Sequence, residues 1–284
     1  MMLNVTDITN LERVYAYQRR LSVPYFFPVG FEIWKESFEK DVDGEGRSLF
    51  KNLQGKVAYD GDVLVGFIQF GNTAFGFDDC GEISADVSYP VVRSLYFEEG
   101  REDAGALLLQ AALDAFAGEK KVYAFFHYFG MSCFARHGKL FEKYTWIKEL
   151  LHQNGFVIEH ENVYYSAELL DTADTEIEVI AHERTVGDQQ MFDFHLNQQH
   201  IGGCEVHYLQ TPGAVFLRWI YVNDEVQNRG VGSKCMTALK GWLCDKGMTQ
   251  LDTDTSLDNL RAQHYYEKNG FTREGITRSY FIEK

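Results

Sequence analysis

Residues 220–243 read IYVNDEVQNRGVGSKCMTALKGWL, and this stretch decides how the rest of the chain is interpreted. Its first residues complete an apolar run, 215–222 (VFLRWIYV), whose length and β-branched and aromatic content predict a buried strand. A polar turn occupies 223–230. After it, apolar side chains recur at every fourth position from Val231 to Leu243, which predicts a helix.

Two glycines, Gly230 and Gly232, lie where the predicted strand turns into the predicted helix. Glycine lets backbone N–H groups come close to a ligand, and a helix start offers unpaired donors and the positive end of the helix dipole. Arg229 and Lys234 add positive charge in a chain whose formal net charge is −15. The turn therefore predicts a phosphate-binding site.

Two common nucleotide-binding motifs do not fit this turn. A Walker A loop places Lys before Ser or Thr, whereas here Ser233 precedes Lys234 and the first glycine of the loop is missing. A dinucleotide-binding GxGxxG would require glycine at position 235, which is Cys235. The expected ligand therefore carries phosphate but is held in neither of these ways.

The composition indicates a folded, acidic protein. Of the 284 residues, 45% are hydrophobic and 15% are aromatic, which is enough for a substantial core. The net charge of −15 argues against a nucleic-acid partner, because phosphate contacts need clustered Lys and Arg. Solubility is one explanation of the acidity, and attraction of a cationic substrate into an acidic cleft is the other.

The cysteines and the N-terminus bear on the cellular compartment. The cysteines are scattered and odd in number, which predicts reduced thiols in a cytoplasmic protein, with neither a disulfide framework nor a metal site. The first residues lack the apolar core of a signal peptide. No apolar run reaches the length of a transmembrane helix, so no membrane partner is expected.

The same order of elements is predicted twice along the chain. In each half a hairpin is followed by strand, helix, strand, helix and strand, and two further helices precede the first hairpin. A short acidic stretch, 171–176, separates the halves. We therefore predict one domain over 1–170 and a second over 177–284, joined by this linker.

Two short motifs support an internal duplication. The sequence Asn-Gly-Phe occurs at 154–156 and again at 269–271, and the segment 101–106 corresponds to 227–232. The distance between these motifs is 11 residues longer in the first half, and we expect this insertion within 129–144.

The second half resembles the GNAT acyltransferase superfamily over nearly its whole length. Residues 227–232 are similar to its signature, Gln/Arg-x-x-Gly-x-Gly/Ala, and 259–271 (NLRAQHYYEKNGF) is similar to its late helix and the exit into a strand. The resemblance implies an α/β fold with a mixed (α+β) sheet, arranged as two tandem GNAT-like acyltransferase domains. It also implies acetyl-CoA as the co-substrate.

The resemblance further implies which residues hold acetyl-CoA. In the family, the central strand splays from its neighbour and the pantetheine arm lies in the gap, paired with the strand backbone. Carried over, the implied binding residues are Ile220, Tyr221, Val222, Gln227, Asn228, Arg229, Gly230, Val231, Gly232, Ser233, Asn259 and Tyr266. The backbone of Ile220 and Val222 would contact the pantetheine and the thioester, and the glycine turn would hold the pyrophosphate.

Tyr266 falls on the position of the tyrosine that protonates the leaving CoA thiolate in the family. A phenol with an ordinary pKa of about 10 is protonated at neutral pH and can do this. The alternative is that Tyr265 and Tyr266 are core aromatics, and at most one of them can face the thioester. Glu205 is our candidate for the general base, with Asp252, Asp254, His207 and His264 as alternatives that no family motif decides between.

The first half departs from the family pattern at the signature. Ala104 replaces its first glycine, and a methyl group there restricts positive φ angles and close phosphate approach. Acidic residues, including Glu102 and Asp103, surround the loop, and Leu151 stands where the second half has Tyr266. The first half is therefore interpreted as a degenerate copy that has lost catalysis.

The predicted activity is transfer of an acetyl group from acetyl-CoA to a primary amine, by direct attack in a ternary complex. The acceptor would be a small-molecule or peptide amine, and its identity and the oligomeric state stay open. One alternative is a non-catalytic acyl-CoA-binding or regulatory protein on the same fold. Another is a different acyl donor, or an aminoacyl-transfer activity that the acidic composition disfavours.

Overall fold

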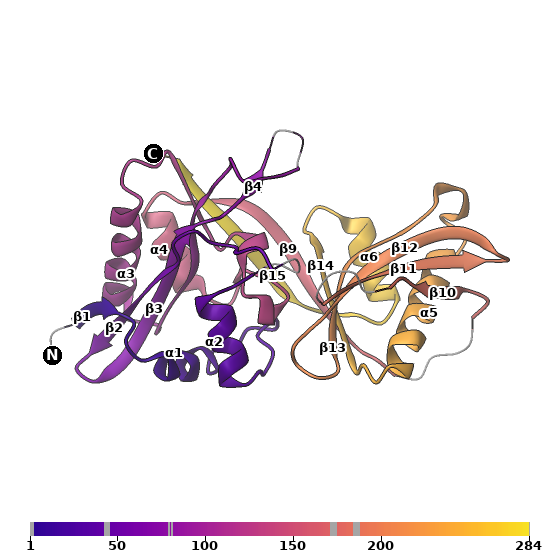
Figure 1. Ribbon diagram of the computed structural model, residues 1–284, viewed down its shortest axis with the longest axis horizontal. Helices are drawn as coiled ribbons and strands as arrows, with labels where there is room; N and C mark the ends of the chain where they lie inside the picture. Colours follow the sequence, from indigo (N-terminus) through magenta and orange to yellow (C-terminus); the bar gives the residue numbers. More distant parts are fainter. Residues whose placement is uncertain are drawn as a thin grey trace. The chain divides into compact units, whose positions relative to one another are not determined.

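The computed structural model describes residues 3–42, 46–78, 80, 82–170, 175–183 and 188–283. Contacts divide the chain into two compact units, one comprising Met1–Glu161 with Thr277–Lys284 and the other Asn162–Ile276 (Figure 1). Two strands, β9 (Val157–Glu168) and β15 (Thr272–Glu283), each contribute residues to both units.

The predicted domain boundary and this division differ at two places. The predicted linker, 171–176, falls inside the second unit, and its residues 171–174 lie outside the described part of the chain. The last described residues of the predicted C-terminal domain, Thr277–Glu283, belong to the first unit, where they pair with β7 and β8. The second unit therefore does not keep the whole of its final strand.

The first unit consists of a mixed sheet with helices on both faces. Its elements are β1 (Leu3–Asp7), α1 (Leu11–Gln18), α2 (Phe31–Glu39), β2 (Gln54–Asp60), β3 (Val63–Asn72), β4 (Gly76–Phe77), β5 (Ile83–Ser84), β6 (Pro90–Phe97), α3 (Glu102–Ala115), β7 (Lys121–Ala124), β8 (Leu140–Phe141) and α4 (Thr145–Gln153). The sheet order is β1-β2-β3-β6-β7-β15, with β6 and β7 parallel.

Side-chain alternation explains why helices cover both faces. Phe67 on β3 meets the Tyr17 ring of α1 at 5.8 Å and the Tyr96 ring of β6 at 5.9 Å. Phe97, which follows Tyr96 on β6, points to the opposite face of the sheet. On that face Gly105 of α3 packs so tightly on the Phe97 ring that an added Cβ would lie 2.4 Å from the ring. The α1 and α3 helices therefore lie on opposite faces of this sheet.

A buried ion pair, Arg93–Asp41, ties α2, β6 and the following loops together. Both side chains are almost fully buried, and Arg93 also donates to backbone oxygens of Ser37, Phe129 and Gly130. Burial lowers the pKa of Arg93, and the neighbouring carboxylate opposes this shift. A charge held so far from water depends on its partner.

Replacing that partner is expected to destabilise the first unit. Asp41→Asn leaves the Arg93 guanidinium buried without a counter-charge, which should lower the free energy of unfolding by about 3 kcal/mol. Asp7→Asn is the matched control, because Asp7 pairs with Lys56 while 81% exposed, and it should cost less than about 1 kcal/mol. Urea unfolding measures both, and equal losses would contradict the assignment.

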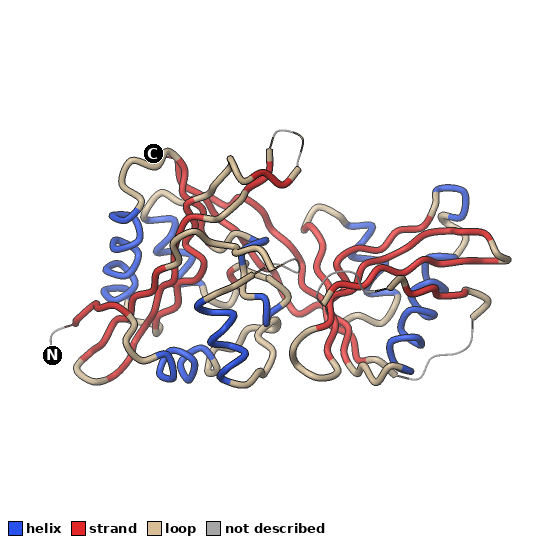
Figure 2. The backbone as a smooth tube through the Cα atoms, in the orientation of Figure 1, coloured by secondary structure: helices blue, strands red, loops and turns tan. Residues whose placement is uncertain are grey.

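The second unit is a mixed sheet with two helices. Its elements are β10 (Glu178–Ala181), β11 (Gln189–Leu196), β12 (Gln199–Tyr208), β13 (Ala214–Val222), α5 (Val231–Asp245), β14 (Gln250–Ser256) and α6 (Leu260–Lys268), with parts of β9 and β15. The sheet order is β9-β14-β13-β12-β11-β10, and of its described strand pairs only β13–β14 is parallel. Figure 2 shows the strands of this unit in red and its helices in blue.

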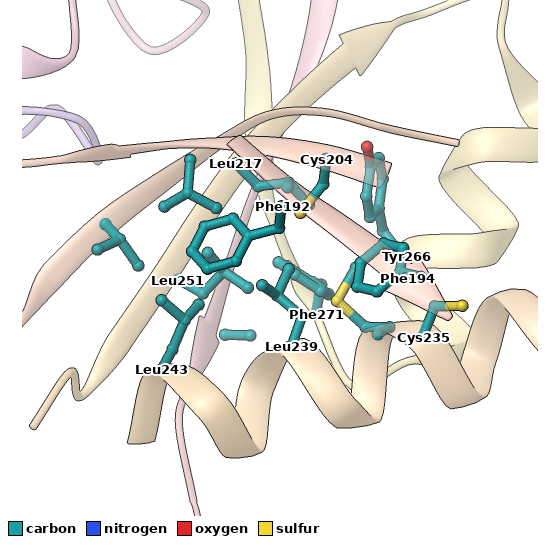
Figure 3. Close-up of a cluster of buried hydrophobic side chains, with 14 of the residues drawn as sticks. Phe192, Phe194, Cys204, Leu217, Cys235, Leu239, Leu243, Leu251, Tyr266 and Phe271 are labelled. Carbon is teal, nitrogen blue, oxygen red and sulfur yellow. The ribbon is translucent and has the colours of Figure 1, made fainter. Parts of the chain in front are cut away.

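One face of the second sheet packs against α5 and α6. The helix residues predicted from the four-residue spacing, Val231, Cys235, Leu239 and Leu243, are all buried in this core. Figure 3 shows Leu239 and Leu243 of α5 beneath strand residues that include Leu217 and Leu251. Burial of each such side chain stabilises the folded state by about 1.5–3 kcal/mol. This packing holds α5 against the sheet and so fixes the position of the turn that precedes it.

The element order agrees with the duplication predicted from the sequence. Each unit has a hairpin followed by strand, helix, strand, helix and strand, and the leading helices α1 and α2 have no counterpart in the described residues of the second unit. The five cysteines are free thiols. In the described residues, no helix combines the length and the apolar character needed to cross a membrane.

Candidate functional site

Strands β13 and β14 separate part of the way along the second sheet. They pair only from Ala214 to Leu217, opposite Gln250–Thr253. The Asn223 N–H donates to the Ile201 carbonyl of β12 at 2.7 Å. Since backbone groups alternate along a strand, the N–H and C=O groups of Ile220 and Val222 point away from β12, toward the opened edge.

A β-bulge lies at the point where the strands separate. Glu205 of β12 is opposite Trp219 and Val206 is opposite Leu217, which leaves Arg218 as the extra residue in β13. Bulges bend and twist a strand and change the direction of nearby side chains. The end of β13 therefore turns away from β14 immediately after its last pair.

A pocket of about 280 Å³ lies along this opened edge. It is formed by the end of β13, the start of α5 and the first turns of α6. Its lining residues are Ile220, Tyr221, Val222, Gln227, Gly232, Asn259, Arg261, Ala262, Tyr265 and Tyr266. The structure thus brings together parts of the chain that are 46 residues apart in sequence, from 220 to 266.

The start of α5 offers backbone donors to this pocket. Gly230 is the N-cap with φ of 79°, a left-handed value that favours glycine, and Asn228 has φ of 60°. In the described part of the chain, no side chain caps this helix. The first N–H groups of a helix have no partner within it, so those of Val231 and Gly232 can bind an anion.

Gln227 and Arg261 form a polar link beside the glycine turn. The Gln227 amide donates to the Val222 carbonyl at 3.0 Å and to Asp224 at 2.7 Å, and its oxygen accepts from Arg261 at 2.8 Å. The Gln227 side chain is therefore committed to protein partners. Arg261 was not predicted from the sequence, although a basic residue in the first helical turn after Asn259 was a usable signal.

The remaining polar residues of the predicted site are placed as follows. Asn259 caps α6, with its Oδ1 accepting from the Ala262 N–H at 3.1 Å. Lys234 forms an ion pair with Glu176. Asn228, Arg229 and Ser233 are near the turn in sequence but do not line the pocket.

Tyr266 is a buried tyrosine that lines the pocket. Its side chain is 6% exposed, and its hydroxyl bonds to Thr253, the β14 residue in the last β13–β14 pair. In Figure 3 the hydroxyl oxygen lies at the sheet, away from α5. Burial raises the pKa of Tyr266, which the Thr253 bond partly opposes, so the phenol keeps its proton at neutral pH.

Tyr265 has a different hydrogen-bonding role. Its hydroxyl donates to the Gly232 carbonyl at 2.8 Å and so joins α6 to the start of α5. Burial raises its pKa as well. Of the two tyrosines, Tyr265 is thus held by a backbone contact, whereas Tyr266 lies where the strands part.

Four of the candidate bases, Glu205, His207, Asp252 and Asp254, lie on the sheet face opposite the helices, whereas His264 is exposed on α6 and does not line the pocket. Glu205 is outside the pocket wall, and the His207 hydrogen bond lowers its pKa, with burial acting in the other direction. Asp252 is fully buried and accepts from Tyr164, Ser166 and Gln250, and burial raises its pKa. A buried carboxylate that already accepts three hydrogen bonds is poorly placed to accept a proton from a substrate.

The corresponding loop of the first unit is arranged differently. The Ala104 N–H donates to its own neighbour, the Asp103 carboxylate, at 2.8 Å, so acid occupies the position of a phosphate. The Trp146 indole donates to the Phe97 carbonyl at 3.0 Å, at the end of β6. An added Cβ at Gly105 would collide with the Phe97 ring.

Aromatic side chains fill the space where β6 and β7 separate. These strands pair only at Val91 and Val92. Beyond that point the Tyr96 ring meets Phe125 at 5.8 Å and Tyr144 at 5.4 Å, and the pocket there measures about 20 Å³. The pocket at this position of the first unit is therefore much smaller than the pocket of about 280 Å³ in the second unit.

The second unit matches a known family in sequence. Residues 155–271 match the model of the acetyltransferase (GNAT) family. Aminoglycoside N(6')-acetyltransferase type 1 from Salmonella typhimurium is 28% identical over 92 residues, and the same holds for the enzyme from Salmonella enteritidis. These matches cover 32% of this chain and 59% of the curated relatives' length.

Solved structures resemble the chain over 99% of its length. One is a GCN5-related glucosamine N-acetyltransferase region of a fungal multi-domain GH3 beta-N-acetylglucosaminidase, with a TM-score of 0.68, 13% identity and 38% of that chain covered. Another is a tandem GNAT protein from the clavulanic acid biosynthesis pathway, with a TM-score of 0.61, 11% identity and 98% covered. Residues 155–271 are therefore similar to the GNAT acetyltransferase family, and the whole chain has the fold of a tandem GNAT protein.

Proposed function

We propose that the second unit binds acetyl-CoA in the pocket beside β13 and transfers its acetyl group to a primary amine. The observation that carries this proposal is the opened strand edge itself. It runs from the uncapped glycine start of α5, past the backbone of Ile220 and Val222 that points away from β12, with the Val222 carbonyl bonded to Gln227, to the buried hydroxyl of Tyr266. Pyrophosphate, pantetheine and thioester would meet these features in that order.

The proposed reaction is a direct attack within a ternary complex. The amine nitrogen bonds to the thioester carbon while a base, for which we propose Glu205, takes a proton from that nitrogen. The C–S bond then breaks, and Tyr266 gives its proton to the departing thiolate sulfur. The products are an amide and free CoA, and the proton returns to Tyr266 from the base through solvent.

Further observations support the proposed co-substrate, cellular compartment and acceptor class. The family match and the curated relatives support acetyl-CoA as the co-substrate. The five free thiols support a reducing, cytoplasmic location. The names of similar proteins include aminoglycoside and glucosamine acetyltransferases, so amino sugars join other small-molecule and peptide amines as candidate acceptors.

Release of the CoA thiol tests the proposed function. Purified protein, acetyl-CoA and a panel of amino sugars, polyamines, amino acids and peptides with free N-termini should give thiol release with at least one acceptor. The acetylated acceptor should appear in equal amount by mass spectrometry. Tight acetyl-CoA binding without turnover across the panel would contradict enzymatic transfer and favour an acyl-CoA-binding role.

We further propose that the first unit binds no acetyl-CoA, because Asp103 and the aromatic filling occupy its equivalent positions. Isothermal titration of the full chain should therefore give one acetyl-CoA per chain. A stoichiometry of two would show that the aromatic side chains move aside and that the copy has kept its ligand.

A further inference from the structure

We propose that His207 positions Glu205 and holds it in the ionised form that the amine acceptor needs. This inference rests on the proposed function, and the two can fail separately. The His207 Nε2 and Glu205 Oε1 atoms lie 2.6 Å apart on the same face of β12. An ionised carboxylate only accepts hydrogen bonds, so the imidazole Nε2 carries the proton and donates it.

The two side chains differ in their access to solvent. His207 is 3% exposed, whereas Glu205 is 18% exposed. The imidazole therefore lies behind the carboxylate, packed next to Phe216, its register partner on β13. In this arrangement an incoming amine reaches Glu205 before it reaches His207, which makes His207 a positioning residue for Glu205.

A second donor fixes the other oxygen of the carboxylate. The Trp219 indole donates to Glu205 Oε2 at 3.0 Å from the opposite strand. Each carboxylate oxygen thus has one protein donor and keeps accepting capacity for a substrate N–H group. Two fixed donors at 2.6 and 3.0 Å hold the carboxylate in one orientation, as a base in a proton transfer requires.

Glu205 on β12 lies beside the part of β13 where β13 separates from β14. Its partner Trp219 lies just after Leu217, where β14 departs, and the Trp219 ring is 5.8 Å from that of Tyr221, which lines the pocket. Cys204 and Val206 on either side of Glu205 are buried in the core under α5 and α6. Glu205 therefore faces the opposite side from Tyr266, so base and acid would approach the thioester from different faces.

The charges around the pair are few among the described residues. Arg218 on β13 lowers the pKa of Glu205 by a smaller amount than His207 does. On β11 the register partners of Glu205 and His207 are Met191 and Gln189, which are uncharged, with Asp193 one pair further along. His207 is thus the main source of the low pKa, and removing its N–H should make Glu205 easier to protonate.

Carbon-13 NMR titration of the glutamate carboxyls in the full chain tests this role without requiring activity, and Glu205→Gln identifies the resonance. The wild-type carboxyl should titrate below the ordinary glutamate range. His207→Phe should move that midpoint up by about 1 pH unit, because a donor to the charged form is lost. His207→Gln, which keeps an N–H donor, should restore most of the shift. Identical midpoints in wild type and His207→Phe would overturn the proposal.

The pH dependence of turnover gives the second readout. The ratio of kcat/KM for His207→Phe to that of wild type, with one acceptor, cancels the titration of the acceptor amine. It should fall about twofold between pH 7 and pH 5 and approach a tenfold fall at lower pH, since the variant loses its base at higher pH. His200→Gln on the same strand is the control, with a flat ratio. A flat ratio for His207→Phe would contradict the proposal even if acetyl transfer itself is confirmed.

Discussion

Tyr266→Phe is expected to lower kcat by at least about 100-fold while changing the affinity for acetyl-CoA by less than about threefold. The substitution removes only the hydroxyl that bonds to Thr253 at the inner end of the pocket. The ring stays in the core, 5.3 Å from Phe271 and 5.7 Å from Tyr165. Binding and packing should therefore survive, and only the proton for the leaving thiolate is lost.

Tyr165→Phe provides the matched control for this variant. It removes one hydroxyl from the neighbouring ring, whose partner is Glu267 on α6, and it should leave kcat near the wild-type value. Thiol-release kinetics and calorimetry with acetyl-CoA measure both variants. If Tyr266→Phe keeps full turnover, Tyr266 is a core aromatic, and another group or solvent protonates the thiolate.

The pH profile adds a check on the same residue. Burial raises the pKa of Tyr266, and the protonated form is the one that acts as the acid. Loss of activity through ionisation of Tyr266 therefore belongs at a higher pH than for an ordinary tyrosine, above about 10. A fall in activity that begins below this pH would reflect the ionisation of a group other than Tyr266.

Gly232→Leu is expected to weaken acetyl-CoA binding by at least about 100-fold without destabilising the fold. Gly232 is in the first turn of α5 and lines the pocket. An added Cβ would meet its nearest neighbour, Tyr265, at 3.4 Å, which is an ordinary contact. The rest of a leucine side chain would fill the space proposed for the cofactor, while leucine in a helix is favoured over glycine by about 0.5–1 kcal/mol.

Gly232→Leu is informative because it should weaken acetyl-CoA binding while leaving the stability of the fold unchanged or higher. Asp245→Leu, at the exposed far end of the same helix, adds the same side chain away from the pocket and should bind acetyl-CoA normally. Calorimetry and thermal unfolding of the two variants give the comparison. Normal binding by Gly232→Leu would show that the cofactor does not pass the start of α5.

The sequence predicted the parts of this site that depend on local pattern. The strand predicted at 215–222 and the helix predicted from Val231 to Leu243 follow from apolar spacing, and the structure has a strand at Ala214–Val222 and a helix at Val231–Asp245 with the predicted face buried. Gly230 was predicted from the turn, and its φ of 79° gives the physical reason. Local rules suffice here because each feature is set by residues within a few positions.

Other features depend on pairing between distant strands and could not be predicted. The separation of β13 from β14 after Leu217 follows from a register that involves β12 and a bulge at Arg218. The assignment of Thr277–Lys284 to the first unit likewise depends on pairing with β7. The periodicity of the sequence predicts neither the separation of β13 from β14 nor the pairing of the last strand with β7.

The choice among candidate bases shows the same limit. The sequence offered Glu205, Asp252, Asp254, His207 and His264 without a motif to separate them. Burial and three donors engage Asp252, and Asn162 donates to Asp254. His207 is instead found hydrogen-bonded to Glu205, a pairing that depends on the alternation of one strand. Geometry therefore orders candidates that residue type alone leaves equal.

Hydrogen–deuterium exchange of the full chain, with and without acetyl-CoA, tests the central claim most directly. That claim is that acetyl-CoA occupies the opened edge of the second unit and no equivalent place in the first. The prediction is slower exchange in 219–234 and 259–266, with no change in 93–106. Slower exchange in 93–106, or none in 219–234, would contradict the account.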